Sequence, residues 1–229
     1  MYPLIHLGIV DSTQTFLARH PELGFCGVLA DMQTAGRGRG GNAWESSQGA
    51  GLWLSARIPP PKIYSGIVLQ SAMVATAEVL KPCGVRLGLK WPNDLVAYRQ
   101  PDKSLVKVGG IIGEQKESCT MLGLGVNLYS APDMPGRAIP PVALIDLGAV
   151  NVPNNIDLAK SILTAWNNLG THTLAFRWPE RGDLIQWEDG SGICQGWEPD
   201  GRLAVQTESG LELLTAGDIR GLEFHDREI

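Results

Sequence analysis

The sequence lacks the segments that would carry it into or across a membrane. It contains no run approaching the ~18 continuous apolar residues that a membrane span requires. The first ten residues also lack the basic start and the long apolar stretch of a secretory signal. We therefore expect a cytoplasmic protein with no membrane partner.

Grouped metal ligands and paired thiols are missing as well. The four cysteines are scattered and include no C-x-x-C pair, and the four histidines form no H-x-x-E-H or similar spacing. A zinc site needs ligands clustered at short spacing, and cytosolic cysteines are ordinarily reduced. We expect no zinc, no haem and no disulfide.

An excess of positive charge is absent too. The 19 Lys and Arg residues against 24 Asp and Glu residues give a net charge of −5. Non-specific nucleic-acid affinity comes from a net basic surface, so this balance argues against a DNA-binding protein. Only ten residues precede Asp11, which we expect to leave no room for a helix-turn-helix module. Any chemistry on phosphates must rest on a few well-placed cations.

The composition that remains is globular and rich in turns. The 229 residues are 44% hydrophobic and 19% charged, with 28 Gly and 15 Pro, which suggests one large domain or a large and a small one. Apolar spacing predicts helices near 16–20, 67–79 and 156–169, and alternation predicts neighbouring antiparallel strands over 107–115 and 119–129. After Trp178-Pro179, short strands separated by Asp-Gly and Ser-Gly turns predict a small antiparallel barrel.

The segment 33–44 is the richest in candidate functional residues. It contains G-x-G-x-x-G, but no helix follows the glycines and no acidic residue lies about twenty positions on, as a dinucleotide site requires. It also lacks the G-K-[ST] of a P-loop. What remains is a flexible loop with Arg37, Arg39 and Trp44, suited to phosphate contacts and to stacking on a base. The alternative is a solvated basic turn.

Three later segments carry further polar or glycine-rich signals, and each by itself fits plain packing equally well. Lys90–Asp94 reads K-W-P-N-D, and its X-Pro step favours an extended strand end from which Asn93 and Asp94 project. In 107–114 a lysine precedes a patch without side chains, on which an apolar ligand fits. The run Gly123–Asn127, G-L-G-V-N, repeats that arrangement.

Together with Asp11-Ser12-Thr13-Gln14, these motifs resemble the biotin protein ligase family in order and approximate spacing, from Asp11 to Asn127. The resemblance is to the single-function type without an N-terminal DNA-binding domain. It implies an α+β fold shared with lipoate ligases and class II aminoacyl-tRNA synthetases, with a mixed or antiparallel sheet flanked by helices. Residues 1–179 would form the catalytic domain and 180–229, closing on Gly217-Asp218-Ile219, the family's SH3-like barrel.

The reaction implied by this resemblance has two halves. Biotin and ATP form biotinyl-5′-AMP and pyrophosphate, and the adenylate then acylates one lysine of a biotin carboxyl carrier protein, a subunit of acetyl-CoA carboxylase. Mg²⁺ would be held by the phosphates, with Asp94 as a further candidate ligand and no other metal site in the protein. A monomer and a homodimer both remain open.

The resemblance also assigns roles to individual residues. Charge neutralisation where the biotin carboxylate meets the α-phosphate falls to Arg37, Arg39 and Lys107. Asp94 would orient or deprotonate the acceptor lysine, the alternative being a cap on the turn after Asn93. The expected biotin contacts are Ser12, Thr13, Gln33, Gly36, Arg37, Lys107, Gly109 and Gly110. The expected ATP and adenylate contacts are Arg37, Gly38, Arg39, Trp44, Asn93, Lys107 and Asn127.

One position departs from the family pattern, which usually carries an arginine two residues before the loop tryptophan. This chain has Asn42 there, so we expect Arg39 and Lys107 to carry more of the load and the adenylate to be held less tightly. Two other functions stay open at this point. One is a lipoate or octanoate ligase of the same fold, and the other is a biotin sensor without catalysis.

Overall fold

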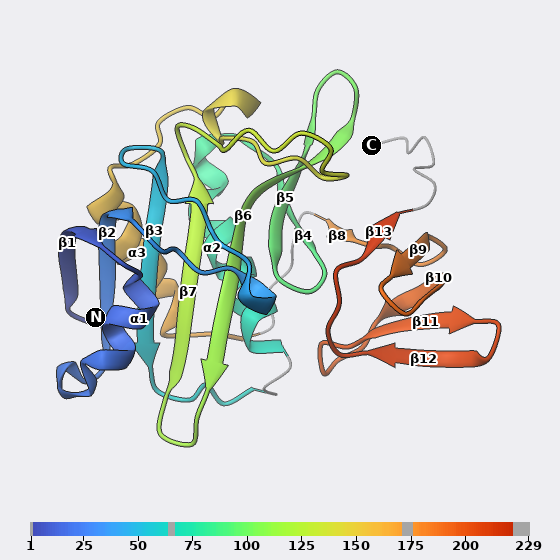
Figure 1. Ribbon diagram of the computed structural model, residues 1–229, viewed down its shortest axis with the longest axis horizontal. Helices are drawn as coiled ribbons and strands as arrows, with labels where there is room; N and C mark the ends of the chain where they lie inside the picture. The colour runs from blue at the N-terminus through green and yellow to red at the C-terminus, as the bar shows by residue number, and fades with distance from the viewer. Residues whose placement is uncertain (1, 64–66, 171–175, 222–229) are drawn as a thin grey trace.

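The computed structural model describes residues 2–63, 67–170 and 176–221, which form two sheets (Figure 1). The large sheet has eight strands in the order β1-β2-β3-β7-β6-β5-β4-β8. The pairs β1–β2 and β4–β8 are parallel and the other pairs are antiparallel, so the expected mixed sheet is confirmed. Its strands are β1 (Leu4–Val10), β2 (Cys26–Gln33), β3 (Gly51–Ile58), β4 (Leu87–Lys90), β5 (Asp94–Arg99), β6 (Ser104–Gln115), β7 (Thr120–Asn127) and β8 (Arg177–Trp178).

Helices cover both faces of the large sheet. The helix α1 (Thr13–Arg19) lies on one face, where Leu17 packs with Val28 and Met121. The longer helices α2 (Val68–Leu80) and α3 (Asn155–Trp166) lie on the other face and bury the main hydrophobic core against it (Figure 1). The remainder of the α1 face is crossed by the loop that follows β2. That face therefore combines a small core with a stretch that only a loop covers.

The second sheet is smaller and antiparallel, in the order β12-β11-β10-β9-β13. Its strands are β9 (Leu184–Trp187), β10 (Gly190–Trp197), β11 (Leu203–Thr207), β12 (Gly210–Leu214) and β13 (Arg220–Gly221). In the described residues β12 and β13 form the two edges, so the expected barrel takes the form of an open sheet. The second β-unit expected after Trp178-Pro179 is present.

The two sheets are held together by a shared core. Trp91, Val96 and Leu105 of the large sheet and its turns pack with Ile185 and Ile219 of the small one. The carbonyl of Gly201, in the turn before β11, accepts hydrogen bonds from Trp91 Nε1 at 2.9 Å and from Gln70 Nε2 at 2.8 Å. The small sheet is thus fixed against both the K-W-P-N-D turn and α2. Within the described ranges, no helix has the length and apolar character needed to cross a membrane.

Candidate functional site

A strip of the large sheet without bulky side chains lies on the α1 face. Gly110 of β6 pairs with Gly125 of β7, and Gly123 pairs with Ser55 of β3. Because alternate residues of a strand face the same side, Gly123 and Gly125 present a continuous patch, with Gly110 and Ser55 beside it. We call these four residues the glycine strip.

The indole of Trp44 covers the glycine strip. A Cβ at Gly125 would overlap the indole, and a Cβ at Gly110 would lie 3.4 Å from Trp44 Cζ3. Both glycines therefore permit a close approach that a side chain would block. Trp44 Nε1 is buried and has no hydrogen-bond partner in the part of the chain that the structure describes, so the indole lies here with an unsatisfied donor.

Lys107 reaches the strip because of a bulge in β6. Leu95 pairs with Gly109 but Val96 pairs with Lys107, so Val108 is an extra residue in β6. A bulge re-aims the neighbouring side chains, and here it puts Lys107 on the same face as Gly110, three residues away. The Lys107 ammonium lies 5.2 Å from the centre of the Trp44 ring, within the range of a cation–π contact. Gly109 faces away from the strip, where a Cβ would lie 2.7 Å from the carbonyl oxygen of Gly125.

Four charged side chains form a chain from the strip to the small sheet. Lys107 Nζ lies 2.6 Å from Asp94 Oδ1, and Lys90 Nζ lies 3.9 Å from Asp94 Oδ2. Lys90, whose side chain is 5% exposed, also donates to Asp218 Oδ1 at 3.1 Å. We call Lys107, Asp94, Lys90 and Asp218 the ionic chain. Burying a charged side chain is costly unless an opposite charge lies beside it, and Asp218 supplies one of the two carboxylates next to Lys90.

The pKa of Asp218 reflects this arrangement. Partial burial by itself would raise the pKa, but the opposite charge and the hydrogen bond of Lys90 outweigh that effect. Arg220 and Lys107 act in the same direction, and the pKa of Asp218 is held below its ordinary value. Both oxygens of Asp94 face lysines, so Asp94 acts as an ion-pair partner here and not as a turn cap.

A second polar group lies at the N-terminus of α1. Gln33 Oε1 accepts hydrogen bonds from Thr13 N at 2.8 Å and from Thr13 Oγ1 at 3.0 Å, and Gln33 Nε2 donates to Ser46 Oγ at 2.7 Å. Thr13 Oγ1 also lies 2.7 Å from Ser55 Oγ. Ser12 is buried and caps the helix by accepting from the backbone of Thr15. The sequence motifs contain Ser12, Thr13 and Gln33 but not Ser46 or Ser55, for which no local pattern exists.

The loop from 34 to 46 closes on itself at its base. Trp44 N donates to the carbonyl of Gly36, and a Cβ at Gly36 would collide with the Trp44 carbonyl and approach Ser46 Oγ to 2.7 Å. Gly38 N donates to the carbonyl of Asn42 at 2.7 Å. The absence of a side chain at Gly36 therefore allows the base of the loop to close. The backbone hydrogen bonds at this base limit how far the loop can move from the strip.

The two loop arginines lie apart from Lys107. Arg37 is exposed, and Arg39 donates at 3.0 Å to the carbonyl of Gly217, in the connection between β12 and β13. Asn42, in place of the usual arginine, donates to the carbonyl of Arg39 at 2.9 Å and so completes the turn at the loop tip. The expected cluster of three cations is thus not assembled in this conformation. One arginine is attached to the small sheet instead.

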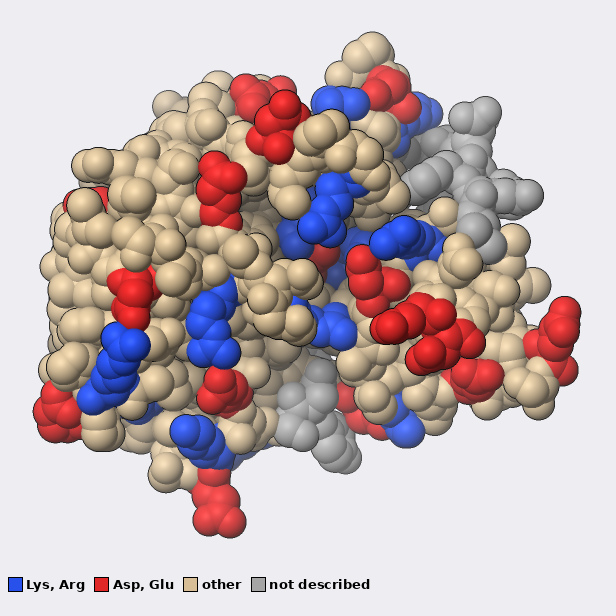
Figure 2. Space-filling view, in the orientation of Figure 1, with Lys and Arg blue, Asp and Glu red and all other residues tan. Residues whose placement is uncertain are grey.

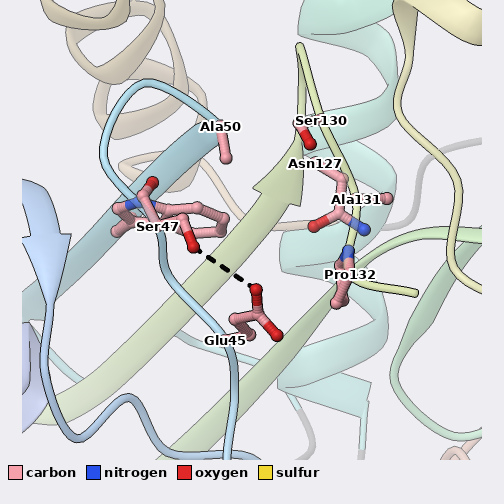
Figure 3. Close-up of a pocket in the computed structure, with 8 residues that line it drawn as sticks. Glu45, Ser47, Ala50, Asn127, Ser130, Ala131 and Pro132 are labelled. Carbon is pink, nitrogen blue, oxygen red and sulfur yellow. Dashed lines mark hydrogen bonds between the residues drawn. The ribbon is translucent and has the colours of Figure 1, made fainter. Parts of the chain in front are cut away.

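The two asparagines occupy different places. Asn93 is buried and donates to the carbonyl of Ile111 at 2.7 Å, which fastens the K-W-P-N-D turn to β6 and leaves it packed against the sheet rather than projecting. Asn127, at the end of β7 on the strip face, lines a small pocket together with Glu45 and Ser47 (Figure 3). With a cavity volume of about 30 Å³, the pocket holds a couple of water molecules and no nucleotide base.

The structure brings some of the expected site residues together, whereas Arg37 and Arg39 lie apart from them. Trp44, Gly110, Lys107 and Asp94 meet at the strip, and Ser12, Thr13 and Gln33 meet at its α1 end. Lys and Arg side chains gather in the hollow between the two sheets (Figure 2). In the described ranges no three His, Cys, Asp or Glu side chains come together as a metal site would require.

Comparison with known proteins places this arrangement in a family. Residues 9–127, more than half of the chain, match the model of the biotin/lipoate A/B protein ligase family. The chain is 27% identical over 216 residues to a biotin--[acetyl-CoA-carboxylase] ligase of Mycobacterium tuberculosis, covering 84% of this chain and 77% of that protein. A ligase of the same name from Paracoccus denitrificans is 29% identical over 221 residues, with 84% and 88% covered.

Solved structures agree in fold. A biotin protein ligase from Aquifex aeolicus in complex with biotin and ATP matches with a TM-score of 0.72 and 22% identity, over 96% of this chain and 100% of that one. A biotin acetyl coenzyme A carboxylase synthetase from Helicobacter pylori matches with a TM-score of 0.64 and 19% identity, over 93% and 100%. The strip, the loop over it and the lysine beside it all fall on or between the strands of this shared sheet. The chain belongs to the biotin/lipoate A/B protein ligase family.

Proposed function

We propose that the protein is a biotin protein ligase. It joins biotin to ATP as biotinyl-5′-AMP and releases pyrophosphate, and it then transfers the biotinyl group to a lysine amine of a biotin carboxyl carrier protein, with release of AMP and a proton. The observation that carries this proposal is the glycine strip bordered by Lys107, with polar side chains at the α1 end. An apolar ligand with a neutral polar head and an anionic tail fits such a surface. The relatives that match most of this chain bear the name of that activity.

The first half-reaction brings two anions together. The carboxylate of biotin attacks the α-phosphate, so negative charge accumulates at the end of the strip where Lys107 lies. Lys107 is held there by Asp94 at 2.6 Å, which fixes its ammonium group before the substrates arrive. Arg37 and Arg39 add two charges once the loop closes over the nucleotide, for which Arg39 exchanges the carbonyl of Gly217 for a phosphate.

Mg²⁺ enters with ATP as part of the substrate. Both oxygens of Asp94 face lysine ammonium groups, and no grouped set of carboxylates occurs among the described residues. The donor set therefore does not fit a metal held by the protein alone. The phosphates of ATP carry the ion, and its charge reduces the repulsion that the attacking carboxylate meets.

The second half-reaction needs a neutral amine on the acceptor lysine. Asp94 has a side chain that is 16% exposed and lies beside the strip, so its carboxylate can accept a hydrogen bond from the incoming amine and orient it. Residues 1–179 supply both half-reactions in this scheme. Of the segment 180–229, the described residues Gly201 and Asp218 stabilise the K-W-P-N-D turn from the other side through Trp91 and Lys90.

Intact-mass analysis tests the proposal. A biotin carboxyl carrier domain is incubated with the protein, ATP and Mg²⁺, with biotin in one arm and octanoate on a lipoyl domain in another. We expect a single biotin-sized gain that depends on ATP and on the target lysine. A gain with octanoate alone would assign the chain to the lipoate side of the family, and no gain in either arm would leave a binding protein without catalysis.

Lys107→Ala gives the residue-level version of that test. Removing a preorganised charge costs on the order of 3 kcal/mol in the barrier, so pyrophosphate release should fall by at least roughly 100-fold. Lys116→Ala, an exposed lysine at the turn after β6, is the matched control and should keep full activity. Normal pyrophosphate release by Lys107→Ala would remove Lys107 from the chemistry.

A further inference from the structure

Gln14 carries a buried acceptor that no other described residue satisfies. It is the second residue of α1 and is 4% exposed, and its Oε1 atom has no hydrogen-bond partner. A buried carbonyl oxygen without a donor is destabilising, because it has lost its water and gained nothing in exchange. A hydrogen-bond donor on a bound ligand would satisfy this oxygen.

The orientation of Gln14 points to the glycine strip. A Cβ built at Gly123 would lie 3.5 Å from Gln14 Oε1, 3.4 Å from Ser55 Oγ and 3.2 Å from Ile112 Cγ1. The oxygen thus borders the small space above Gly123, at the α1 end of the strip. It faces the same surface that Trp44 covers one step further along β7.

The neighbouring polar groups are already paired with one another. Gln33 Oε1 accepts two hydrogen bonds from Thr13, and Gln33 Nε2 donates to Ser46. Thr13 Oγ1 and Ser55 Oγ share a hydrogen bond. A carbonyl oxygen has two lone pairs, so Gln33 has no acceptor capacity left. Among these described side chains, the unsatisfied acceptor is Gln14 Oε1.

The two ends of the strip differ in charge. Gln14 is neutral and accepts, whereas Lys107 beside Gly110 is positive. Gly123 and Gly125 are separated by about 7 Å along β7, and β6 lies about 5 Å to the side. A ligand that spans the strip therefore meets an acceptor at its head and a cation at its tail. Biotin has two ureido N–H donors at one end and a carboxylate at the other.

Resting on the proposed function, we infer that Gln14 Oε1 accepts a hydrogen bond from one ureido N–H of biotin and so selects biotin over lipoate and octanoate. Neither competitor has an N–H donor in its head group. A site built to pair with a donor rejects analogues that lack it, because the acceptor is then left buried and unpaired. Gln14 is in this view a specificity-determining residue, whereas Thr13 and Gln33 shape the surrounding network.

Isothermal titration calorimetry with Gln14→Met tests the inference. Methionine keeps the length of the side chain and removes the acceptor, and Gln115→Met, on an exposed glutamine of β6, is the matched control. We expect biotin to bind Gln14→Met roughly tenfold more weakly, and Gln115→Met to bind like the wild type. Two biotin analogues can be made, each with one of the two ureido N–H groups replaced by oxygen. One of them should bind the wild type more weakly than biotin does, and that analogue and biotin should bind Gln14→Met with equal affinity.

Thermal unfolding without biotin separates a binding role from a structural one. Because Oε1 has no partner, Gln14→Met should leave the melting temperature of the unbound protein unchanged or raise it, and only the shift produced by biotin should shrink. Gln14→Leu serves as a second apolar variant if the methionine variant fails to fold. If a folded variant binds biotin as tightly as the wild type does, and the wild type still labels the carrier, the inference about Gln14 is overturned and the proposed function stands. Absence of biotin binding by the wild type would overturn the proposed function with it.

Discussion

At the scale of single residues, the site depends on what is absent from the strip. Gly125 and Gly110 allow the Trp44 indole to lie against the sheet, and this contact also positions the ring next to Lys107. A methyl group at either glycine would lift the ring. The glycines of G-L-G-V-N therefore have a steric role, which the amino-acid composition alone does not reveal.

Gly125→Ala tests this steric role. Its Cβ would lie above the strip, in the space that the Trp44 indole occupies without a ligand and that biotin takes when it displaces the ring, so the strip loses depth. We expect adenylate formation, followed by pyrophosphate release, to fall at least about tenfold, because small displacements at a reacting centre have large effects on rate. Gly8→Ala on β1, where an added Cβ meets nothing within 4 Å, is the control. Equal rates for both variants would show that the strip tolerates a side chain at this position.

At the scale of elements, the loop from 34 to 46 joins the two sheets through its tip. Arg39 contacts Gly217 in the connection between β12 and β13, and Asn42 stabilises the turn that presents Arg39. The loop therefore has an anchored conformation, and closure over a nucleotide must break that anchor. The expectation that Asn42 weakens adenylate retention stays a prediction.

Arg39→Ala should loosen retention of biotinyl-5′-AMP. The variant loses both the anchor and one positive charge for the phosphate, so the reactive adenylate should leave before the carrier arrives. Mass spectrometry of a mixture of carrier and serum albumin measures this as biotin on albumin lysines. Arg137→Ala, an exposed arginine elsewhere, should label the carrier alone. Unchanged selectivity in Arg39→Ala would count against Arg39 as part of a lid.

The helices and strands also show how much of the fold can be predicted from the sequence. Periodicity predicts β6, β7 and the three α-helices of the described residues, but it does not predict β5, because K-W-P-N-D reads as the end of a strand. It is instead the turn between β4 and β5, with Lys90 paired to Asp94. Strict alternation would also place Lys107 and Gly110 on opposite faces, and only the bulge at Val108 brings them together.

Local sequence patterns do not predict the contacts between segments that are distant in the chain. Thr13 and Gln33 were both expected at the site, but their direct hydrogen bonds, and the pairing of Thr13 with Ser55, depend on how α1 packs on the sheet. Lys90 and Asp218 are 128 residues apart, and no local pattern predicts that they meet. Sequence motifs supply the chemistry of the site, and tertiary packing decides which side chains pair.

At the scale of the whole molecule, the ionic chain couples the small sheet to the site. Asp218 neutralises Lys90, Lys90 faces Asp94, and Asp94 holds Lys107. The shared core around Trp91 and the two hydrogen bonds to Gly201 fix the geometry of this coupling. A change in the small sheet can therefore alter the position of Lys107 without touching it.

Asp218→Asn tests this coupling through its pH dependence. The folded pKa of Asp218 lies below its unfolded value, so the ion pair stabilises the protein above the unfolded pKa, about 4, and is lost as pH falls through the folded pKa. We expect the variant to be less stable than the wild type by about 0.5–1 kcal/mol at pH 7, measured by urea unfolding, since Asp218 is partly exposed. The difference should shrink as the pH falls below about 4 toward the lowered pKa of folded Asp218, and pyrophosphate release at pH 7 should also slow. A difference that does not shrink at all as the pH falls below about 4 would contradict the ion-pair explanation.

The position of the Trp44 indole has a thermodynamic consequence. Because the ring already shields the glycine strip from water, a ligand that enters there exchanges places with protein and displaces little apolar hydration. The negative heat-capacity change that normally accompanies apolar burial should then be small for biotin binding, less than the contact area of the ligand would suggest. The loop tryptophan keeps the sheet dry between turnovers.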